Sequence, residues 1–198
     1  MSTVSPPPPP PPPPSPPHPA RETTDAGARA GTSRTWLPPE EYAATLPKAT
    51  LFGCVFFTDR HDRPLHLRSV YSPEHPWQWA GGTAEDGERP WETAVRETEE
   101  ETGIVVPGPP RLLAAVFGLP GAAWPFATVG YVFDGGRLSD RQIAAITLSP
   151  EEHDEVRALP LEEWRDLMPA RDFDRLTAVM DARRRGTTAY FDTWDWEA

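Results

Sequence analysis

Apolar and polar positions along the chain predict a sheet that begins in its first half. Residues 49–59 form an apolar, aromatic run bounded by turn residues, and residues 63–71 follow after a short polar connection. The two segments are therefore predicted to pair as strands. Residues 76–82 predict a third extended piece, in which Trp77 and Trp79 lie on one face because side chains alternate along a strand.

The rest of the chain predicts further strands and the helices that cover them. Strands are predicted at residues 111–121 and 124–136, and the second of these ends in a Gly-Gly turn. Helices are predicted at residues 37–47, 90–102, 159–169 and 171–186, the last with an apolar stripe of Phe173, Leu176, Val179 and Met180. This order predicts the α/β class, as an α/β/α sandwich with helices on both sides of a mixed sheet.

Composition divides the chain into a proline-rich tail and one folded domain. Proline accounts for 27 of the 198 residues, and many of the prolines lie in residues 5–20, which predicts a solvated polyproline II segment. We expect residues 1–35 to form a disordered tail and residues 36–198 to form the domain, whose length suits one sizeable core. The tail is either an inert extension or a ligand for an aromatic groove of a partner.

Charge and cysteine content narrow the function classes. A formal net charge of −11 argues against binding to nucleic acid backbones, which depends on Lys and Arg. The single cysteine, Cys54, excludes a disulfide framework and a cysteine-rich zinc site, and its apolar setting predicts a buried strand residue rather than a catalytic thiol. No apolar run reaches the roughly 18 residues of a membrane span and no signal peptide is evident, so we expect a cytoplasmic protein without a membrane partner.

The predicted helix at residues 90–102 is unusually acidic at its end. It is predicted to begin at Pro90 and to stop at Gly103 in a left-handed conformation. Its apolar stripe consists of Trp91, Ala94, Val95 and Thr98. Beside this stripe, Glu97, Glu100 and Glu101 share one sector of the helix, whereas Glu99 points away and Glu92 can pair with Arg96.

Three converging carboxylates at the C-terminus of a helix need a compensating charge. They repel one another, and the helix dipole disfavours each by a few tenths to about 1 kcal/mol. A divalent cation would make the arrangement favourable, and oxygen ligands without clustered His or Cys point to Mg²⁺ or Mn²⁺ rather than zinc. Because Mg²⁺ often bridges to phosphates, the pattern suggests phosphate chemistry. The glutamate run alone also fits an ordinary solvated helix, and the residues upstream decide between the two.

Residues 82–104 resemble the Nudix box of the Nudix hydrolases, Gly-x5-Glu-x7-Arg-Glu-U-x-Glu-Glu-x-Gly-U with U aliphatic. The seven fixed identities of the box are present as Gly82, Glu88, Arg96, Glu97, Glu100, Glu101 and Gly103. The departure is Thr98, which stands at the first aliphatic position. It can face the core if its hydroxyl bonds a carbonyl one turn back.

The resemblance implies a Nudix-type fold and Mg²⁺-dependent hydrolysis of the diphosphate linkage in a nucleotide or another nucleoside diphosphate derivative. It allows Mn²⁺ as the metal and, because family members often pair, a homodimer. The implied roles are metal ligation for Glu97, Glu100, Glu101 and the Gly81 carbonyl, orientation of the glutamates for Arg96, and support of the box for Gly82, Glu88 and Gly103.

The general base lies either in the box or in the later acidic segment, residues 149–157, which contains Glu151, Glu152, Asp154 and Glu155. We favour Glu152 and Glu155 as catalytic acids beside Arg96, Glu97 and Glu100, although the segment also fits a solvated loop. His153 fits a surface position or a contact to the substrate.

Substrate choice would come from aromatic side chains on which a nucleobase stacks. The candidates are Trp77, Trp79, Trp124, Phe126 and residues 190–196, and each also fits ordinary core packing. Two other functions remain open on this fold. A nucleotide-sensing module that does not cleave would be marked by lost box acids, and none is lost. An isomerase would need further cysteine or metal-ligand residues, which Cys54 alone supports poorly.

Overall fold

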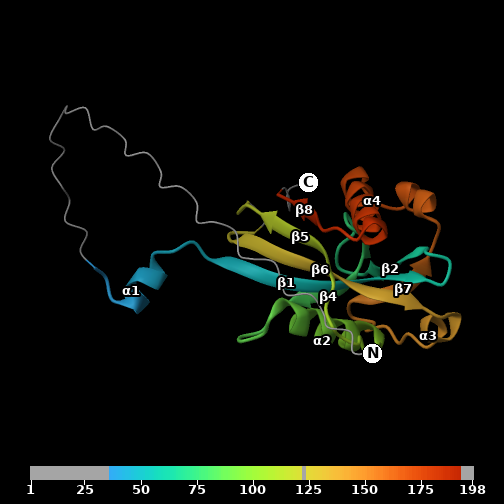
Figure 1. Ribbon diagram of the computed structural model, residues 1–198, viewed down its shortest axis with the longest axis horizontal. Helices are drawn as coiled ribbons and strands as arrows, with labels where there is room; N and C mark the ends of the chain where they lie inside the picture. The colour runs from blue at the N-terminus through green and yellow to red at the C-terminus, as the bar shows by residue number, and fades with distance from the viewer. Residues whose placement is uncertain (1–35, 122–123, 193–198) are drawn as a thin grey trace, which may run out of the picture. The chain divides into compact units, whose positions relative to one another are not determined.

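The computed structural model describes residues 36–121 and 124–192 (Figure 1). Its contacts divide the chain into two units, Met1–Tyr42 and Ala43–Ala198. The predicted tail, residues 1–35, lies outside the described residues, as do residues 193–198 of the C-terminal aromatic segment. Helix α1 (Pro39–Ala44) forms where a short helix is predicted, and none of its residues is buried.

A mixed sheet forms the centre of the second unit, as the sequence predicts. Its main path runs in the order β3-β2-β1-β6-β5-β8, while β4 pairs with β1 and β7 pairs with β2. The pairs β1–β6 and β5–β8 are parallel, and the other pairs are antiparallel. The strands are β1 (Ala49–Asp59), β2 (Pro64–Ser69), β3 (Trp77–Gln78), β4 (Ala80–Thr83), β5 (Leu112–Gly118), β6 (Ala127–Leu138), β7 (His153–Ala158) and β8 (Ala189–Phe191).

Helices cover both faces of this sheet, which confirms the predicted sandwich (Figure 1). One face packs against α2 (Pro90–Thr102), and the other packs against η1 (Leu161–Asp166) and α4 (Ala170–Arg185). A short helix, α3 (Asp140–Ala144), follows β6. None of the helices in the described part of the chain is long and apolar enough to cross a membrane.

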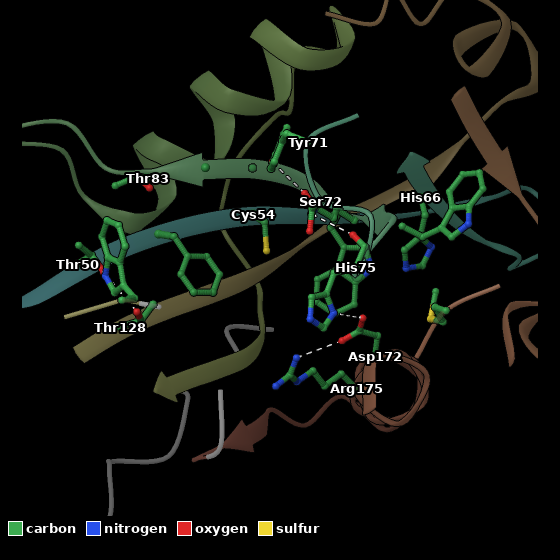
Figure 2. A pocket seen from close by; sticks show the side chains of 18 of the residues that line it. Thr50, Cys54, His66, Tyr71, Ser72, His75, Thr83, Thr128, Asp172 and Arg175 are labelled. Atoms are coloured by element: carbon green, nitrogen blue, oxygen red, sulfur yellow. Dashed lines mark hydrogen bonds and ion pairs between the residues drawn. The ribbon is translucent and has the colours of Figure 1, made fainter. Parts of the chain in front are cut away.

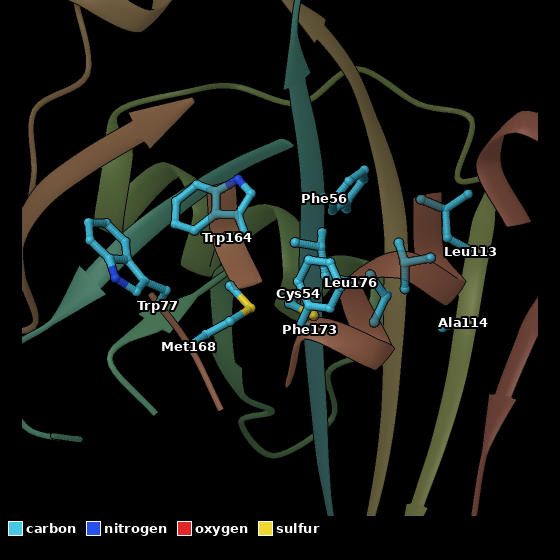
Figure 3. Close-up of a cluster of buried hydrophobic side chains, with 11 residues drawn as sticks. Cys54, Phe56, Trp77, Leu113, Ala114, Trp164, Met168, Phe173 and Leu176 are labelled. Carbon is cyan, nitrogen blue, oxygen red and sulfur yellow. The ribbon is translucent and has the colours of Figure 1, made fainter. Parts of the chain in front are cut away.

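Strand β1 divides the core into two clusters because its side chains alternate between the faces. Cys54 and Phe56 pack with Trp164 and Leu176 on the side of η1 and α4 (Figure 3). Val55 and Phe57 instead join the cluster that contains Ala94 of α2. The prediction of Cys54 as a buried strand residue is confirmed, since only 7% of its surface is exposed.

Local signals define both ends of α2 at the predicted residues. Pro90 occupies the first turn, and Gly103 ends the helix in the left-handed region at φ 69°. The predicted pairing of Glu92 with Arg96 is wrong. The Glu92 carboxylate instead accepts a hydrogen bond from the backbone N–H of Arg89 at 2.9 Å, because the free N–H groups of a helix start attract such acceptors.

Thr98 lies at the centre of the α2 interface and is fully buried. Its hydroxyl donates to the carbonyl of Ala94 at 2.7 Å, one turn back, as predicted. That carbonyl belongs to the helical hydrogen-bond ladder, so the threonine hydroxyl adds little to stability.

We expect Thr98→Val to raise the free energy of unfolding by up to about 1 kcal/mol, because a methyl group replaces a desolvated hydroxyl of the same size. Chemical denaturation measures the change. Thr93→Val is the matched control with the opposite sign, because the Thr93 hydroxyl donates to the Glu88 carboxylate at 3.0 Å. Equal destabilisation by both variants would contradict the prediction.

Two predicted features differ in the structure. The Gly-Gly pair at residues 135–136 is not a turn, since β6 continues to Leu138 and a β-bulge forms opposite Phe56 and Phe57. A Cβ on Gly135 would lie 2.2 Å from the Phe57 ring, so the bulge needs glycine there. The predicted helix at residues 159–169 is a 3₁₀ helix, η1.

The acidic segment is also different, because it contains a strand rather than a loop. Strand β7 begins at His153 and pairs with β2. Arg68 of β2 forms cross-strand ion pairs with Asp154 at 2.6 Å and with Glu155 at 3.0 Å, and Val156 and Ala158 of β7 pack against the core cluster that contains Ala94. Cross-strand pairs of opposite charge favour strand pairing.

Candidate metal centre and adjoining cavity

Arg96 organises the acidic end of the α2 region. Its guanidinium forms a bidentate pair with Glu88, at 2.7 Å and 3.0 Å, and donates to the Thr83 carbonyl at 3.2 Å. A further nitrogen lies 3.0 Å from both the Glu97 and the Glu100 carboxylates. The Arg96 hydrogen bonds lower the pKa of Glu88 to about 2. One arginine thus fixes the loop before the helix to two glutamates on the helix.

Glu101 is the buried acid of the site, with 3% of its surface exposed. One carboxylate oxygen accepts a hydrogen bond from the backbone N–H of Gly81 at 2.8 Å. Burial raises the pKa of Glu101 to about 8, and the negative charges of Glu152, Glu97 and Glu100 add to this effect. A cation in the site would reverse that shift, because it stabilises the ionised form.

The glycines of strand β4 let the glutamates approach the backbone. A Cβ on Gly82 would lie 2.5 Å from the carboxyl carbon of Glu97, and one on Gly81 would lie 2.3 Å from the Cβ of Cys54. Burial is also the main reason that the pKa of Glu97 is raised. Gly81, at φ 152°, therefore requires glycine, whereas a side chain on Gly82 would displace the Glu97 carboxylate.

The acidic segment contributes two residues to the site. Glu101, Glu152 and His153 each place one ligand atom within 4.8 Å of the others. Glu155 is not part of this group. Its carboxylate forms ion pairs with Arg68 and with Arg157, the latter at 2.5 Å. The structure thus separates the two acids that the sequence favours as catalytic, and Glu152 is the one it brings to the box.

His153 is the functional candidate whose position the sequence misjudges. A surface position is wrong, since only 1% of the residue is exposed. Its Nδ1 lies 3.8 Å from a Glu101 oxygen, and burial lowers its pKa. Neither ring nitrogen has a hydrogen-bond partner among the described residues. No local sequence signal marks this burial, because it follows from the pairing of β7 with β2.

These residues fit a divalent cation. Glu101 and Glu152 offer carboxylate oxygens at this place, and the buried carboxylate of Glu101 is destabilised without a counter-charge. Glu97 and Glu100 pair with Arg96, and their role as metal ligands remains a prediction. The unpartnered ring of His153 points to a further polar group or ion in the same place. The Gly81 carbonyl, expected as a ligand from the sequence, remains a prediction.

The raised pKa of Glu101 predicts that the metal-free protein loses stability as the pH rises from 6.5 to 8. The folded state holds a proton that the unfolded chain releases near pH 4.5, so the proton-linked stability disappears as the pH approaches about 8. Below pH 6.5 the lowered pKa values of His66 and His153 act in the opposite sense. Thermal unfolding in a chelator should therefore show a melting temperature that falls over this window.

Glu101→Gln provides the control for that pH dependence, because glutamine has no proton to lose. Its melting temperature should stay nearly flat between pH 6.5 and 8 in the same buffer series. A wild-type curve as flat as that of the variant would contradict the assignment.

A cavity of about 540 Å³ lies beside strand β4, and Figure 2 shows side chains that line it. Its lining includes Gly81 and Gly82, which also contact the glutamates of α2. Figure 2 shows the hydrogen bond between His75 Nδ1 and the Asp172 carboxylate, 2.7 Å apart, in the wall of the cavity. The cavity thus joins apolar walls with a few polar groups, as ligand pockets do.

The predicted stacking aromatics divide between core and cavity. Trp77 is buried at 7% exposure and Trp79 packs edge-on against Phe56, but both also line the cavity. Trp124 also lines the cavity, is 41% exposed and donates from its ring nitrogen to the Thr50 hydroxyl at 3.1 Å. Phe126 packs edge-on against Trp124. Burial raises the pKa of Cys54, so its thiol is not activated.

Comparisons with known proteins agree with this geometry. Residues 47–179, about two thirds of the chain, match the family model described as NUDIX domain. No curated protein matches the chain.

Solved structures share the fold at low sequence identity. A MutT protein from Methanosarcina mazei Go1 is 24% identical, with a TM-score of 0.55, over 71% of this chain and 96% of that chain. The NUDIX domain of Shewanella oneidensis NrtR, complexed with ADP ribose, is 23% identical, with a TM-score of 0.54, over 76% and 100%. A UDP-X diphosphatase is 18% identical, with a TM-score of 0.56, over 80% and 77%.

Proposed function

Because the chain belongs to the NUDIX family, we propose that it uses Mg²⁺ or Mn²⁺ to hydrolyse the diphosphate linkage of a nucleotide or another nucleoside diphosphate derivative. Family membership supplies the reaction class, a hydrolase acting on phosphorus-containing anhydrides. The metal and the substrate are the proposed parts. The observation that carries the metal is the buried cluster in which Glu101, 3% exposed, Glu152 and His153 each place one ligand atom within 4.8 Å of the others. The proposed substrate follows from the reaction class of the family.

The residues of the site would have different roles in such a reaction: some bind the ion and others orient the ligands. Glu97, Glu100, Glu101 and the Gly81 carbonyl would hold the ion. When bound, the ion supplies a Lewis acid for the phosphoryl oxygens and lowers the pKa of a bound water. Arg96 keeps Glu97 and Glu100 in place, since its Nη1 lies 3.0 Å from each carboxylate.

Glu152 is the proposed general base, and it would take the proton of the attacking water. It lies within reach of Glu101 in the acidic cluster, and its carboxylate forms none of the ion pairs that occupy Glu155. Glu155 already pairs with two arginines, Arg68 and Arg157, so it suits a structural role. We therefore assign the base to Glu152 alone.

The adjoining cavity would receive the group attached to the diphosphate. Its volume of about 540 Å³ falls in the range of small-molecule sites. Trp77, Trp79 and Trp124 line it and offer faces or edges to a planar ring. The NrtR domain binds ADP ribose, so this compound belongs in any panel of test substrates.

The test is phosphate and pyrophosphate release from a panel of nucleotide diphosphate derivatives, measured with Mg²⁺, with Mn²⁺ and with chelator. We expect release from one class of compound, and we expect chelator to abolish it. Glu100→Gln should lower turnover by at least about 10-fold. Glu99→Gln should not, because Glu100 pairs with Arg96 while Glu99 is predicted to point away from the other acids.

The second candidate is a module that binds a nucleotide without cleaving it. Tight binding of a panel compound without product in either metal would favour it over hydrolysis. The retention of every acid of the box speaks against it. A homodimer, a cytoplasmic location and the lack of nucleic acid binding stay predictions from the sequence.

A further inference from the structure

We propose that His153 is a metal ligand and that the site therefore prefers a divalent first-row transition ion to Mg²⁺. The inference rests on the proposed function for the place of the metal. It changes the donor set, since the box supplies oxygen ligands only and His153 would add a nitrogen.

The first observation is the state of the His153 side chain. It is 1% exposed, and neither ring nitrogen has a hydrogen-bond partner in the described part of the chain. Buried polar groups in folded proteins almost always have a partner, and an exception indicates a water or an ion at that place. A neutral imidazole carries a lone pair on one nitrogen, which is the form that binds metals.

The second observation is the direction of the ring. Its Nδ1 lies 3.8 Å from one oxygen of Glu101, beyond hydrogen-bond distance. The other oxygen of Glu101 is held by the N–H of Gly81 at 2.8 Å. The free oxygen of Glu101 and the Nδ1 of His153 therefore face each other across a gap that no described hydrogen bond closes.

The backbone fixes this arrangement. The N–H of Val70 donates to the Glu152 carbonyl at 2.9 Å, and the N–H of His153 donates to the Ser149 carbonyl at 2.8 Å. His153 is also paired with Ser69, where the register of β2 and β7 shifts. The histidine is thus presented by a sheet rather than by a free loop, which suits a ligand position.

The distances suit an ion bound between these groups. Ligand atoms on opposite sides of a small divalent ion, with bonds of about 2.1 Å, lie about 4.2 Å apart. The atoms of Glu101, Glu152 and His153 lie within 4.8 Å of one another. Small side-chain adjustments would bring Glu101 and His153 into contact with one ion and leave Glu152 beside it.

The donor set then determines the metal. Mg²⁺ takes oxygen ligands and keeps several waters, whereas imidazole nitrogen suits transition ions. One nitrogen with carboxylate oxygens is a mixed set, for which transition ions gain affinity and Mg²⁺ does not.

The experiment adds Mn²⁺ to the full-length, metal-free protein without substrate and looks for nitrogen coupling to the bound ion by pulsed electron paramagnetic resonance. We expect coupling in the wild type and its loss in His153→Gln. Titration calorimetry should show Mn²⁺ affinity falling about 10-fold in that variant, with a smaller change for Mg²⁺. His61→Gln, an exposed histidine whose ring contacts Arg60, should leave both unchanged.

The outcomes separate ligation from a positioning role and from the proposed function. Glutamine keeps a hydrogen-bond donor, so equal effects on both metals, or no nitrogen coupling in the wild type, would overturn the inference. Hydrolysis with Mg²⁺ in a protein without nitrogen coupling would leave the proposed function standing alone. Nitrogen coupling without hydrolysis of any panel compound would support the ligand and contradict the proposed function. The wild-type spectrum decides the question even if the variant fails to fold.

Discussion

Glu101→Gln is expected to lower turnover by about 100-fold or more while leaving the metal-free protein folded. Removal of groups that merely orient metal ligands lowers activity about 10- to 100-fold, and Glu101 would be a ligand itself. Its pKa is raised to about 8 by burial, so near neutral pH the metal-free carboxyl already resembles a neutral amide. The side-chain carbonyl of glutamine can still accept the hydrogen bond from Gly81.

Steady-state hydrolysis and thermal unfolding together check this expectation. The melting temperature of the variant without metal should match the wild type near pH 7, whereas the increase that Mg²⁺ or Mn²⁺ gives the wild type should be lost. Glu99→Gln is the matched control, because Glu99 lies in the same turn and is exposed. Undiminished turnover in Glu101→Gln would remove this residue from the mechanism.

Gly53→Ala should reduce the free energy of unfolding by about 3 kcal/mol, the upper part of the range for overpacked cores. A Cβ on Gly53 would lie 2.2 Å from the carbonyl oxygen of Pro90 and 3.1 Å from the backbone nitrogen of Ala94. Both contacts are backbone atoms of α2, so no side-chain rotation relieves them. The first turn of α2 would have to move away from β1.

Urea denaturation measures the effect, and Gly108→Ala serves as the control. A Cβ on Gly108 meets no atom within 4 Å, so that substitution should change stability little. If Gly53→Ala were as stable as the control, the close packing of α2 on β1 would be wrong.

The sequence predicts both ends of α2 and the hydrogen bond of Thr98 well, because the residues that determine them are close in the sequence. Pro90 at the start and Gly103 at the end act within one turn, and Thr98 meets its carbonyl partner in the same helix. The common side of the helix that Glu97, Glu100 and Glu101 share follows from helix periodicity, whereas their role as metal ligands stays a prediction. Glu92 had two possible partners, the backbone N–H of Arg89 and the side chain of Arg96. Helix periodicity does not decide between them, and the structure shows the bond to Arg89.

Features that depend on distant residues could not be read in the same way. Strand β7 exists through its pairing with β2, and that pairing brings His153 beside Glu101. The bulge at Gly135 depends on the Phe57 ring of another strand. His75 and Asp172 meet in the cavity wall although 97 positions separate them. Spacing along the chain carries no information about such contacts.

The alternation of side chains along β1 separates the cavity from the helix that carries the glutamates. This separation matters for redesign of the protein. Cys54 faces the cavity side, while Val55 faces the helix that carries the glutamates. Gly81 and Gly82 line the cavity and have no side chains, so a substitution in the cavity wall meets no side chain of theirs that could displace the glutamates. If the cavity receives the substrate as proposed, exchanging side chains in its wall would change which substrate binds while leaving the glutamates of α2 in place.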